Sequence, residues 1–315
     1  MLNRRHLRVK VVQALYAYYQ SESNDVKPFE KALLQSVDKV NEMYIWMLSL
    51  LTEVADYSVR DAEERANKYL PSEADLNAST QLKENVFIRT LLENRQFQAA
   101  EKKYATSWSF DPEIVKSLFS TLKSTPEYTE YLQAPDRSIR AEKDIIKFIF
   151  KKVIMKSPAV EQAFEERFIS WPVDKEVLQA MIAKTFKNFA SENPQENSLA
   201  QLTPDWAEDR VFIIDLFNKT IAHEEEYQEL ISQKTKNWEA ERIAMMDTLL
   251  MRTAITELVH FSSIPVKVTI NEYIEIAKEF STPKSNSFIN GILDKIFGDL
   301  KAAGKIRKFG RGLLE

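Results

Sequence analysis

The sequence predicts an all-α protein, and three observations lead to this fold class. Apolar residues recur every three or four positions in each long apolar stretch, which is the period of a helix packed on one side. The strict alternation of apolar and polar residues that marks a strand is hard to find. The chain has 5 glycines, none before Gly291, so glycine turns that join β-strands are missing from most of its length. With 315 residues, the chain is long enough for about two domains.

The first two predicted helices lie at the start of the chain. Residues 4–20 form the first, and its apolar face consists of Leu7, Val11, Ala14, Leu15 and Tyr18. The polar residues 21–25 end it. A second helix is predicted for 28–70, where Pro71 closes the block. Its apolar residues, in the same rhythm, are Phe29, Leu33, Val37, Val40, Tyr44, Met47 and Leu51.

Residues 72–197 are predicted to form shorter helices rather than a sheet, because prolines interrupt them at close intervals. These prolines are Pro112, Pro126, Pro135, Pro158, Pro172 and Pro194. The piece 91–105 resembles one half of a tetratricopeptide unit. It has no partner at the repeat period, so the sequence does not support a solenoid.

Four more helices are predicted after the polar stretch 192–204. Apolar positions of the first are Ile213, Leu216, Phe217, Ile221 and Tyr227, and those of the second are Ile243, Met246, Leu250, Ala254 and Leu258. Asn237 is a candidate N-cap of the second helix. Thr269 and Glu272 have the spacing of a capping box at the start of the third. The last helix is predicted to begin near Ser285 and to bury Phe288, Ile292 and Ile296.

Composition and charge narrow the functional class. The formal net charge is −4 and the pI about 5.7, which argues against a protein that coats nucleic acid with its whole surface. Any nucleic-acid site must be local, and cations do gather at the two ends of the chain, within 4–10 and 301–311. The absence of cysteine fits a reducing compartment, and no segment approaches about 18 uninterrupted apolar residues. We therefore expect a cytoplasmic protein with no membrane partner.

The sequence predicts no catalytic site, no cofactor and no metal centre. Without cysteine there is no thiol nucleophile, and without glycine before Gly291 there is no glycine-rich loop to bind a nucleotide phosphate upstream. Glu257 and His260 form a single E-x-x-H motif, whereas a di-iron bundle needs two. His223 fits no zinc-ligand spacing. The chain is expected to act by recognition and assembly and not as an enzyme.

Three arginines crowd the start of the first helix: Arg4, Arg5 and Arg8. Cations in the first turn oppose the helix dipole, at a cost of roughly a few tenths of a kcal/mol each. An RNA backbone laid across this helix end reverses the sign, because phosphates meet both the unsatisfied N–H groups and the guanidinium groups. We therefore expect these arginines to contact phosphates. The competing interpretation is a solvated helix end with ordinary arginine side chains.

Polar and aromatic side chains extend this candidate RNA site along the helix. At 3.6 residues per turn, Arg5, His6, Gln13 and Tyr16 fall within an arc of about 100° on the side away from the apolar face. Tyr16 is placed to stack on an unpaired base, which is the usual way in which proteins hold single-stranded RNA.

Two separated segments resemble the NusB family of transcription antitermination factors. Residues 4–20 resemble the arginine-rich first helix of that family, and 237–297 resemble its carboxyl-terminal half. The second segment keeps the family's order of a Trp-led helix, an IPVKVTINE turn and an S-x-x-F-I-N-G-I-L-D-K helix. Residues 26–200 have no assigned counterpart, and they are either a large insertion or a tandem elaboration of the same helical unit.

The resemblance implies a NusB-like helical bundle of two packed helical subdomains, to which this chain adds a helical middle region. Three positions depart from the family pattern, since Leu7 replaces a small residue, Val9 an acidic residue and Ser281 a glycine. The expected parts are the arginine-rich first helix, the middle region, a NusB-like carboxyl-terminal domain and a basic tail, at 1–25, 26–200, 201–300 and 301–315.

The resemblance also implies a function. NusB proteins bind the boxA element of single-stranded ribosomal RNA leader transcripts together with a small ribosomal protein, NusE, in the transcription elongation complex. Phe288 is expected beside the RNA site, and Lys284 and Ser285 are expected either to bind phosphate or to act as an ordinary N-cap. Asp247 is expected either to face the ribosomal protein or to form an internal ion pair. The alternative function is a helical scaffold for protein–protein interaction without RNA binding.

Overall fold

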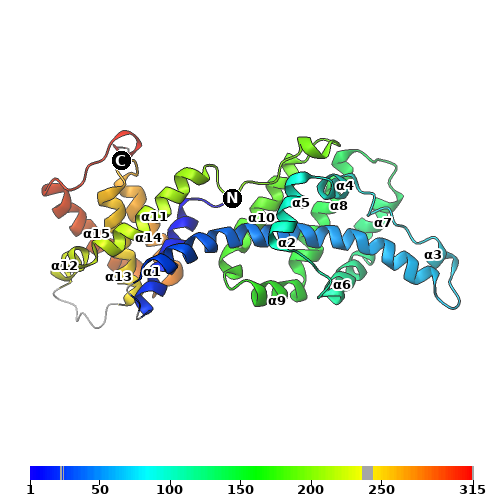
Figure 1. Ribbon diagram of the computed structural model, residues 1–315, viewed down its shortest axis with the longest axis horizontal. Helices are drawn as coiled ribbons and strands as arrows, with labels where there is room; N and C mark the ends of the chain where they lie inside the picture. Colours follow the sequence, from blue (N-terminus) through cyan, green and yellow to red (C-terminus); the bar gives the residue numbers. More distant parts are fainter. Residues whose placement is uncertain (22, 24, 236–243, 314–315) are drawn as a thin grey trace. The chain divides into compact units, whose positions relative to one another are not determined.

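The computed structural model describes residues 1–21, 23, 25–235 and 244–313, and every regular element in these ranges is helical (Figure 1). The all-α prediction is confirmed. The chain divides into two compact units, which we call the middle unit and the terminal unit. The middle unit consists of Met1 and Asp38–Pro204, and the terminal unit of Leu2–Val37 and Asp205–Glu315. Across the described ranges, we find no helix with the length and hydropathy that a bilayer-spanning segment needs.

Helix α1 (Arg4–Gln20) begins and ends where the sequence predicts. Asn3 is its N-cap, because the side chain accepts hydrogen bonds from the backbone N–H groups of Arg5 and His6. In return, the Nδ1 atom of His6 accepts a bond from the backbone of Asn3. A cap of this kind is made within four residues, so it is encoded locally.

Helix α2 (Lys27–Ala66) is continuous and contributes residues to both units, and the division between the units falls within it, between Val37 and Asp38. The expected division after residue 25 falls ahead of this helix, because periodicity does not show where a long helix changes neighbours. The helix also ends four residues before the predicted 70, and the exposed Tyr69 and Leu70 follow it.

The middle unit is built of short helices, as the spacing of prolines predicts. Pro112, Pro126 and Pro158 each occupy the first turn of a helix, where the missing N–H group costs nothing. The elements are α3 (Glu73–Leu76), α4 (Val86–Leu92), α5 (Arg95–Tyr104), α6 (Pro112–Lys123), α7 (Pro126–Gln133), α8 (Ile139–Phe148), a π-helical turn (Ile149–Val153), a 3-10 turn (Ile154–Lys156), α9 (Pro158–Arg167), α10 (Trp171–Asn188) and a second 3-10 turn (Pro194–Glu196).

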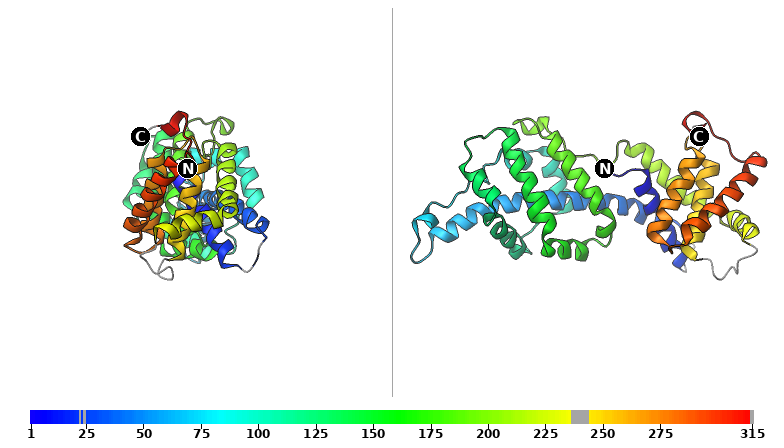
Figure 2. Two further views of the ribbon diagram at one scale, coloured as in Figure 1. Left: turned by 90° about the vertical axis from the view of Figure 1, so that its left-hand side faces the viewer. Right: turned by 180° about the vertical axis from the view of Figure 1, so that it is seen from behind.

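Aromatic side chains fill the core of the middle unit. Trp46 of α2 meets Trp108 edge to face at 5.4 Å between ring centroids. Phe164 of α9 lies 4.6 Å from Trp171 of α10, again between centroids. Figures 1 and 2 show the cyan and green helices of this unit arranged along the blue α2. The edge-to-face pair adds about 0.5–1.5 kcal/mol beyond the burial of its area.

The terminal unit packs α1 against helices from the carboxyl-terminal third of the chain. These are α11 (Trp206–Ala222), α12 (Glu224–Lys234), α13 (Met245–His260), α14 (Val266–Phe280) and α15 (Ser285–Ala302). Helix α1 contacts α11, α13 and α14. The last helix begins at the predicted residue and buries Ile292 and Ile296, whereas Phe288 is only half-buried.

Three predictions for this unit need correction or fall outside the description. The single helix expected around 213–227 is two helices, separated at His223. The capping box of Thr269 and Glu272 is wrong, because α14 already begins at Val266 and both residues lie inside it. Asn237, the predicted N-cap of the next helix, lies outside the described residues, and the described helix begins at Met245.

Candidate nucleic-acid interface

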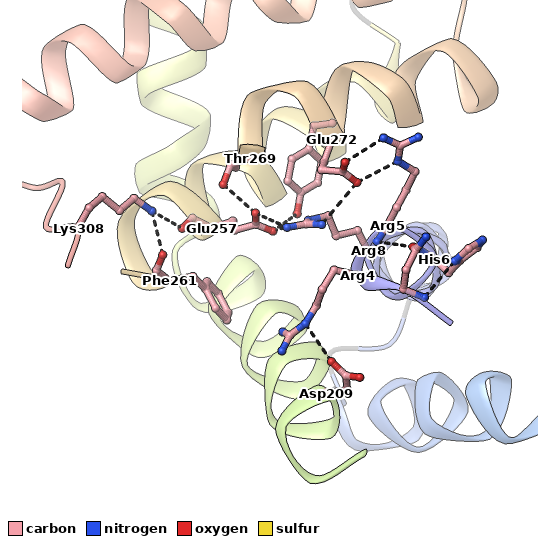
Figure 3. Close-up of polar contacts among 12 residues, drawn as sticks. Arg4, Arg5, His6, Arg8, Asp209, Glu257, Phe261, Thr269, Glu272 and Lys308 are labelled. Atoms are coloured by element: carbon pink, nitrogen blue, oxygen red, sulfur yellow. Dashed lines mark hydrogen bonds and ion pairs between the residues drawn. The ribbon is translucent and has the colours of Figure 1, made fainter. Parts of the chain in front are cut away.

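Arg8 lies inside the terminal unit and forms a buried ion pair with Glu257 of α13 (Figure 3). The Arg8 side chain is 2% exposed and that of Glu257 is 0% exposed. Two parallel bonds join them, from Nε to Oε2 and from Nη2 to Oε1, each of 2.7 Å. Such a bidentate pair matches the planar guanidinium to the carboxylate and fixes the rotation of α1 against α13.

The buried carboxylate of Glu257 has further donors. Thr269 of α14 donates a hydrogen bond to Oε1 at 2.8 Å, and the Tyr273 hydroxyl donates one to Oε2 at 3.3 Å. Burial, together with the adjacent Glu257 carboxylate, raises the pKa of Tyr273 well above its usual value. Burial opposes the charge on Arg8, but the attraction of Glu257 outweighs it and raises the pKa of Arg8. The cluster is therefore satisfied and charged.

Arg5 reaches the surface and makes a bidentate pair with Glu272 of α14, with both bonds at 2.9 Å (Figure 3). Its side chain is 44% exposed. Glu272 also lies 3.6 Å from Nη1 of Arg8. Burial opposes ionisation of Glu272, but the hydrogen bond from Arg5 and the charges of both arginines outweigh burial and lower its pKa. Glu272 thus has two cations, one exposed and one buried.

Arg4 is turned toward α11. Its guanidinium pairs with Glu208 at 2.6 Å and with Asp209 at 2.9 Å, and it lies over the Phe212 ring at 4.3 Å from the centroid. The solvated arginines of the competing interpretation are therefore not what the structure contains. Each of the three arginines has a carboxylate partner from the distant part of the chain.

The expected phosphate contact from Arg8 is not supported by this geometry. A phosphate would have to displace Glu257 from a buried pair and leave that carboxylate without a cation. The helical wheel already contained a signal, since Arg8 lies about 20° from Leu15 and about 60° from Val11 at 100° per residue. Sequence reasoning weighed the dipole of the helix end and missed that Arg8 belongs to the apolar face.

The remaining predicted residues of α1 lie together on the other side of the helix. Tyr16 is 40% exposed, and its hydroxyl accepts a hydrogen bond from Gln20. Arg5 is exposed, and His6 and Gln13 are half-buried. These four residues, which we call the α1 face, form the part of the predicted site that reaches the surface.

The second predicted part of the site, at the start of α15, is only partly exposed. Lys284 is exposed and Phe288 is half-buried, but Ser285 is buried and donates a hydrogen bond of 2.7 Å to Asp247. Ser281 donates to the other carboxylate oxygen of Asp247. The serine that departs from the family's glycine therefore anchors the loop before α15.

Asp247 has a role that sequence reasoning did not anticipate. It is 6% exposed, so it presents little surface to a partner, and its described partners are hydroxyl groups rather than a cation. Arg252, one turn further along α13, pairs instead with Glu224 and Gln228 of α12. Asp247 thus connects the start of α13 to the loop that leads into α15.

The basic tail is docked on the carboxyl end of α13. Lys308 donates hydrogen bonds to the backbone oxygens of Phe261 at 2.9 Å and Glu257 at 3.4 Å, where a helix end carries unpaired carbonyls. Burial, opposed by the charge of Glu257, lowers the pKa of Lys308 to about 8. No local pattern predicts this contact, because Lys308 and Glu257 are 51 residues apart.

The fold and these contacts define an all-helical protein whose terminal unit presents a basic and aromatic helix face. The NusB family model matches residues 175–297. Curated relatives include three proteins named "Transcription antitermination protein NusB". The protein of Chloroherpeton thalassium is 43% identical over 104 residues, that of Salinibacter ruber 47% over 105, and that of Geobacter sulfurreducens 42% over 106. No solved structure matches the chain.

The matched stretches are 33%, 33% and 34% of this chain, and they span 49%, 66% and 77% of the three relatives in the same order. The chain belongs to the NusB family. The family match starts within α10, so most of the middle unit, up to residue 174, lies outside it.

Proposed function

We propose that this chain is a transcription antitermination factor that binds single-stranded boxA-type RNA of ribosomal RNA leader transcripts together with a small ribosomal protein of the NusE type. On this proposal it acts in the cytoplasm, within the transcription elongation complex, and it catalyses no reaction. The observation that carries the proposal is the α1 face, where the exposed Arg5 and Tyr16 lie on the helix of the terminal unit that packs against the NusB-matched helices.

The arrangement around Glu272 suits Arg5 to a phosphate ligand. When Arg5 turns from Glu272 to an RNA phosphate, Arg8 remains 3.6 Å from Glu272, so this carboxylate keeps a nearby cation, which it shares with Glu257. Arg5 thereby exchanges a carboxylate for a phosphate, and Glu272 keeps part of its charge compensation. Arg8 is the residue that makes this exchange possible, and it acts from the interior.

Tyr16 complements Arg5 at the far end of the same face. Eleven residues separate them, which is about 16 Å along the axis at 1.5 Å per residue. One strand of RNA that follows the helix meets a guanidinium at one end and an aromatic ring at the other. Stacking on such a ring contributes about 1–3 kcal/mol per base. His6 and Gln13 supply hydrogen-bonding groups between them, and Arg4, Lys284 and Phe288 flank the site in this proposal.

The test is a binding titration of the full chain with boxA RNA, with and without the ribosomal protein. Arg5→Ala is expected to weaken binding and to reduce the slope of log affinity against log salt by about 0.7, the value for one phosphate contact on a single strand. Tyr16→Ala is expected to weaken binding by about 5-fold to 150-fold with the slope unchanged, because stacking releases no counterions. The matched control is Arg60→Ala, which removes another exposed, carboxylate-paired arginine from the middle unit.

A scaffold without RNA binding is the second candidate, and the pairing of Arg4, Arg5 and Arg8 with carboxylates favours it. The two proposals differ in one result. A chain that binds boxA RNA no more tightly than an unrelated RNA, even with the ribosomal protein present, is the scaffold. Because binding is reciprocally coupled, RNA that tightens the protein pair by the same factor supports the antitermination factor.

A further inference from the structure

The middle unit contains a basic segment that the NusB match does not cover. Residues 139–156, which form α8 and the two turns after it, contain six cations and only two carboxylates. The chain as a whole has a net charge of −4, so this concentration runs against its composition. The six cations are Arg140, Lys143, Lys147, Lys151, Lys152 and Lys156.

Four of these cations have no carboxylate partner among the described residues. Arg140, Lys151, Lys152 and Lys156 are exposed and form no ion pair there, whereas Lys147 pairs with Asp144. Six lysines elsewhere in the same unit do pair with carboxylates, namely Lys39, Lys68, Lys83, Lys103, Lys123 and Lys175. The two carboxylates of the segment are unavailable to the four, since Glu142 is buried beside Arg137 and Asp144 pairs with Lys147.

The segment buries its apolar side chains, and its unpaired cations lie on the surface. Its buried side chains are Ile145, Ile146, Ile149, Phe150, Val153 and Ile154. The π-helical turn Ile149–Val153 contains three of these buried residues, and within it Lys151 and Lys152 both remain exposed. Isolated π-turns are rare and occur frequently at functional sites.

One lysine of α10 lies close to this segment because α8 contacts the end of α10. Lys143 donates hydrogen bonds to the backbone oxygens of Phe186 at 3.2 Å and Phe189 at 2.9 Å, at the carboxyl end of that helix. The exposed Lys187 lies between these two residues in sequence. The end of α10 is therefore joined to α8, and we call Arg140, Lys151, Lys152, Lys156 and Lys187 the lysine surface.

We propose that the lysine surface binds the phosphate backbone of single-stranded RNA, so that the middle unit lengthens the RNA footprint of this long NusB protein. This inference rests on the proposed function. Lysine ammonium groups are point charges that bind phosphate without the planar, bidentate geometry of base recognition. The contact is therefore independent of base sequence.

Charge and apolar exposure favour RNA over an acidic protein as the partner. The cores of protein–protein interfaces are enriched in aromatic and other apolar side chains. Within residues 139–156 and α10 no large hydrophobic side chain is exposed, and the exposed ones that come before and after in the chain are Phe110 and Ile169. A surface of unpaired cations with no apolar centre fits a phosphate backbone.

The test compares two RNAs that both contain boxA, one limited to that element and one extended by an unstructured single strand. Lys151→Ala, Lys152→Ala and Lys156→Ala are combined in the full chain. At about 0.1 M salt each lost phosphate contact lowers affinity about 5-fold, because the slope is about 0.7 per contact on a single strand. We expect the triple variant to bind the extended RNA up to about 100-fold more weakly, with the slope reduced by about 2, and the short RNA as the wild type does.

The matched control removes Lys39, Lys103 and Lys175, which carry the same charge in the same unit but are paired with carboxylates. It is expected to bind both RNAs like the wild type. Unchanged affinity and slope of the lysine variant on the extended RNA overturn the inference. So does a loss by that variant of binding to polyglutamate, or to the ribosomal protein, while RNA binding persists.

The two proposals fail in different ways. If Arg5→Ala abolishes boxA binding and the lysine variant changes nothing, the inference falls and the proposed function stands. If RNA binding depends on the lysine surface but not on boxA or Arg5, the proposed function falls and the lysine surface stands. A wild-type chain that binds neither RNA overturns both.

Discussion

Replacing Glu257 by glutamine tests whether the buried ion pair with Arg8 holds α1 in place. The carboxylate is fully buried and accepts two bonds of 2.7 Å from Arg8. Glutamine keeps the shape but removes the charge and turns an NH₂ group toward the guanidinium. A buried charge left without its partner costs about 3–5 kcal/mol. Because Glu272 remains 3.6 Å from Arg8, we expect a loss of about 3 kcal/mol, at the lower end of that range.

The expected loss is large enough to measure in two ways. For a unit of roughly 150 residues, a change of 1 kcal/mol shifts Tm by about 2–4 °C, so Glu257→Gln lowers the Tm of the terminal unit by about 6–12 °C. Hydrogen exchange of amides in α1 and α13 reports the same loss locally, without contribution from the middle unit.

The control for this prediction removes both charges. Arg8→Met combined with Glu257→Leu leaves no unpaired ion but removes the acceptor of the Thr269 and Tyr273 hydroxyls, so we expect it to recover part of the stability that Glu257→Gln loses. The reasoning is refuted if Glu257→Gln costs less than about 1 kcal/mol and the double variant is no more stable than the single one.

Three further predictions concern Glu272 and the docked tail. The pKa of Glu272 is lowered in the folded state, so its stabilising effect is present above its usual pKa of 4.5. In urea unfolding, the wild type should therefore lose stability relative to Glu272→Gln as pH falls below about 4.5. Curves of unfolding free energy against pH that run parallel for the two proteins would contradict this. Burial lowers the pKa of Lys308 from 10.5 to about 8, so wild type should gain stability relative to Lys308→Met as pH rises from about 8 to 10.5, and a constant difference would count against it. A Cβ atom on residue 312 would lie 1.9 Å from the backbone oxygen of Ser262, which accepts a hydrogen bond from the Phe309 amide. Gly312→Ala should therefore release the tail and speed hydrogen exchange of the Phe309 amide. The control Gly298→Ala, where a Cβ atom has nothing within 4 Å, should leave that exchange unchanged.

Local patterns carried the prediction of the helices. The apolar rhythm of 4–20, with Asn3 capping within four residues, placed α1 correctly. Prolines indicated that the middle region is divided into short helices, and three of them stand at the starts of α6, α7 and α9, because a proline is tolerated in the first turn and disfavoured further in. The two wrong helix predictions in the terminal unit also came from local patterns. The break at His223 has no proline or glycine to mark it, and the capping-box spacing at Thr269 recurs by chance inside a helix.

The functional residues were predicted less well than the helices, since their partners are remote in sequence. The wheel placed Arg5, His6, Gln13 and Tyr16 on one face, and that face reaches the surface at Arg5 and Tyr16. Val9 lies within the same arc and is nevertheless buried. Periodicity shows which residues share a side of a helix, but not how much of that side a neighbouring element covers.

The sequence by itself determined the fold class, the bounds of α1, the start of α15 and the likeness to NusB, because periodicity, capping and motif order are properties of neighbouring residues. Only the tertiary structure decided which charges are paired. Arg4 meets Glu208, Arg8 meets Glu257 and Arg5 meets Glu272 across 204, 249 and 267 residues of chain. The strength of an ion pair depends on distance in space and on burial, and neither is set until α1 packs against α11, α13 and α14.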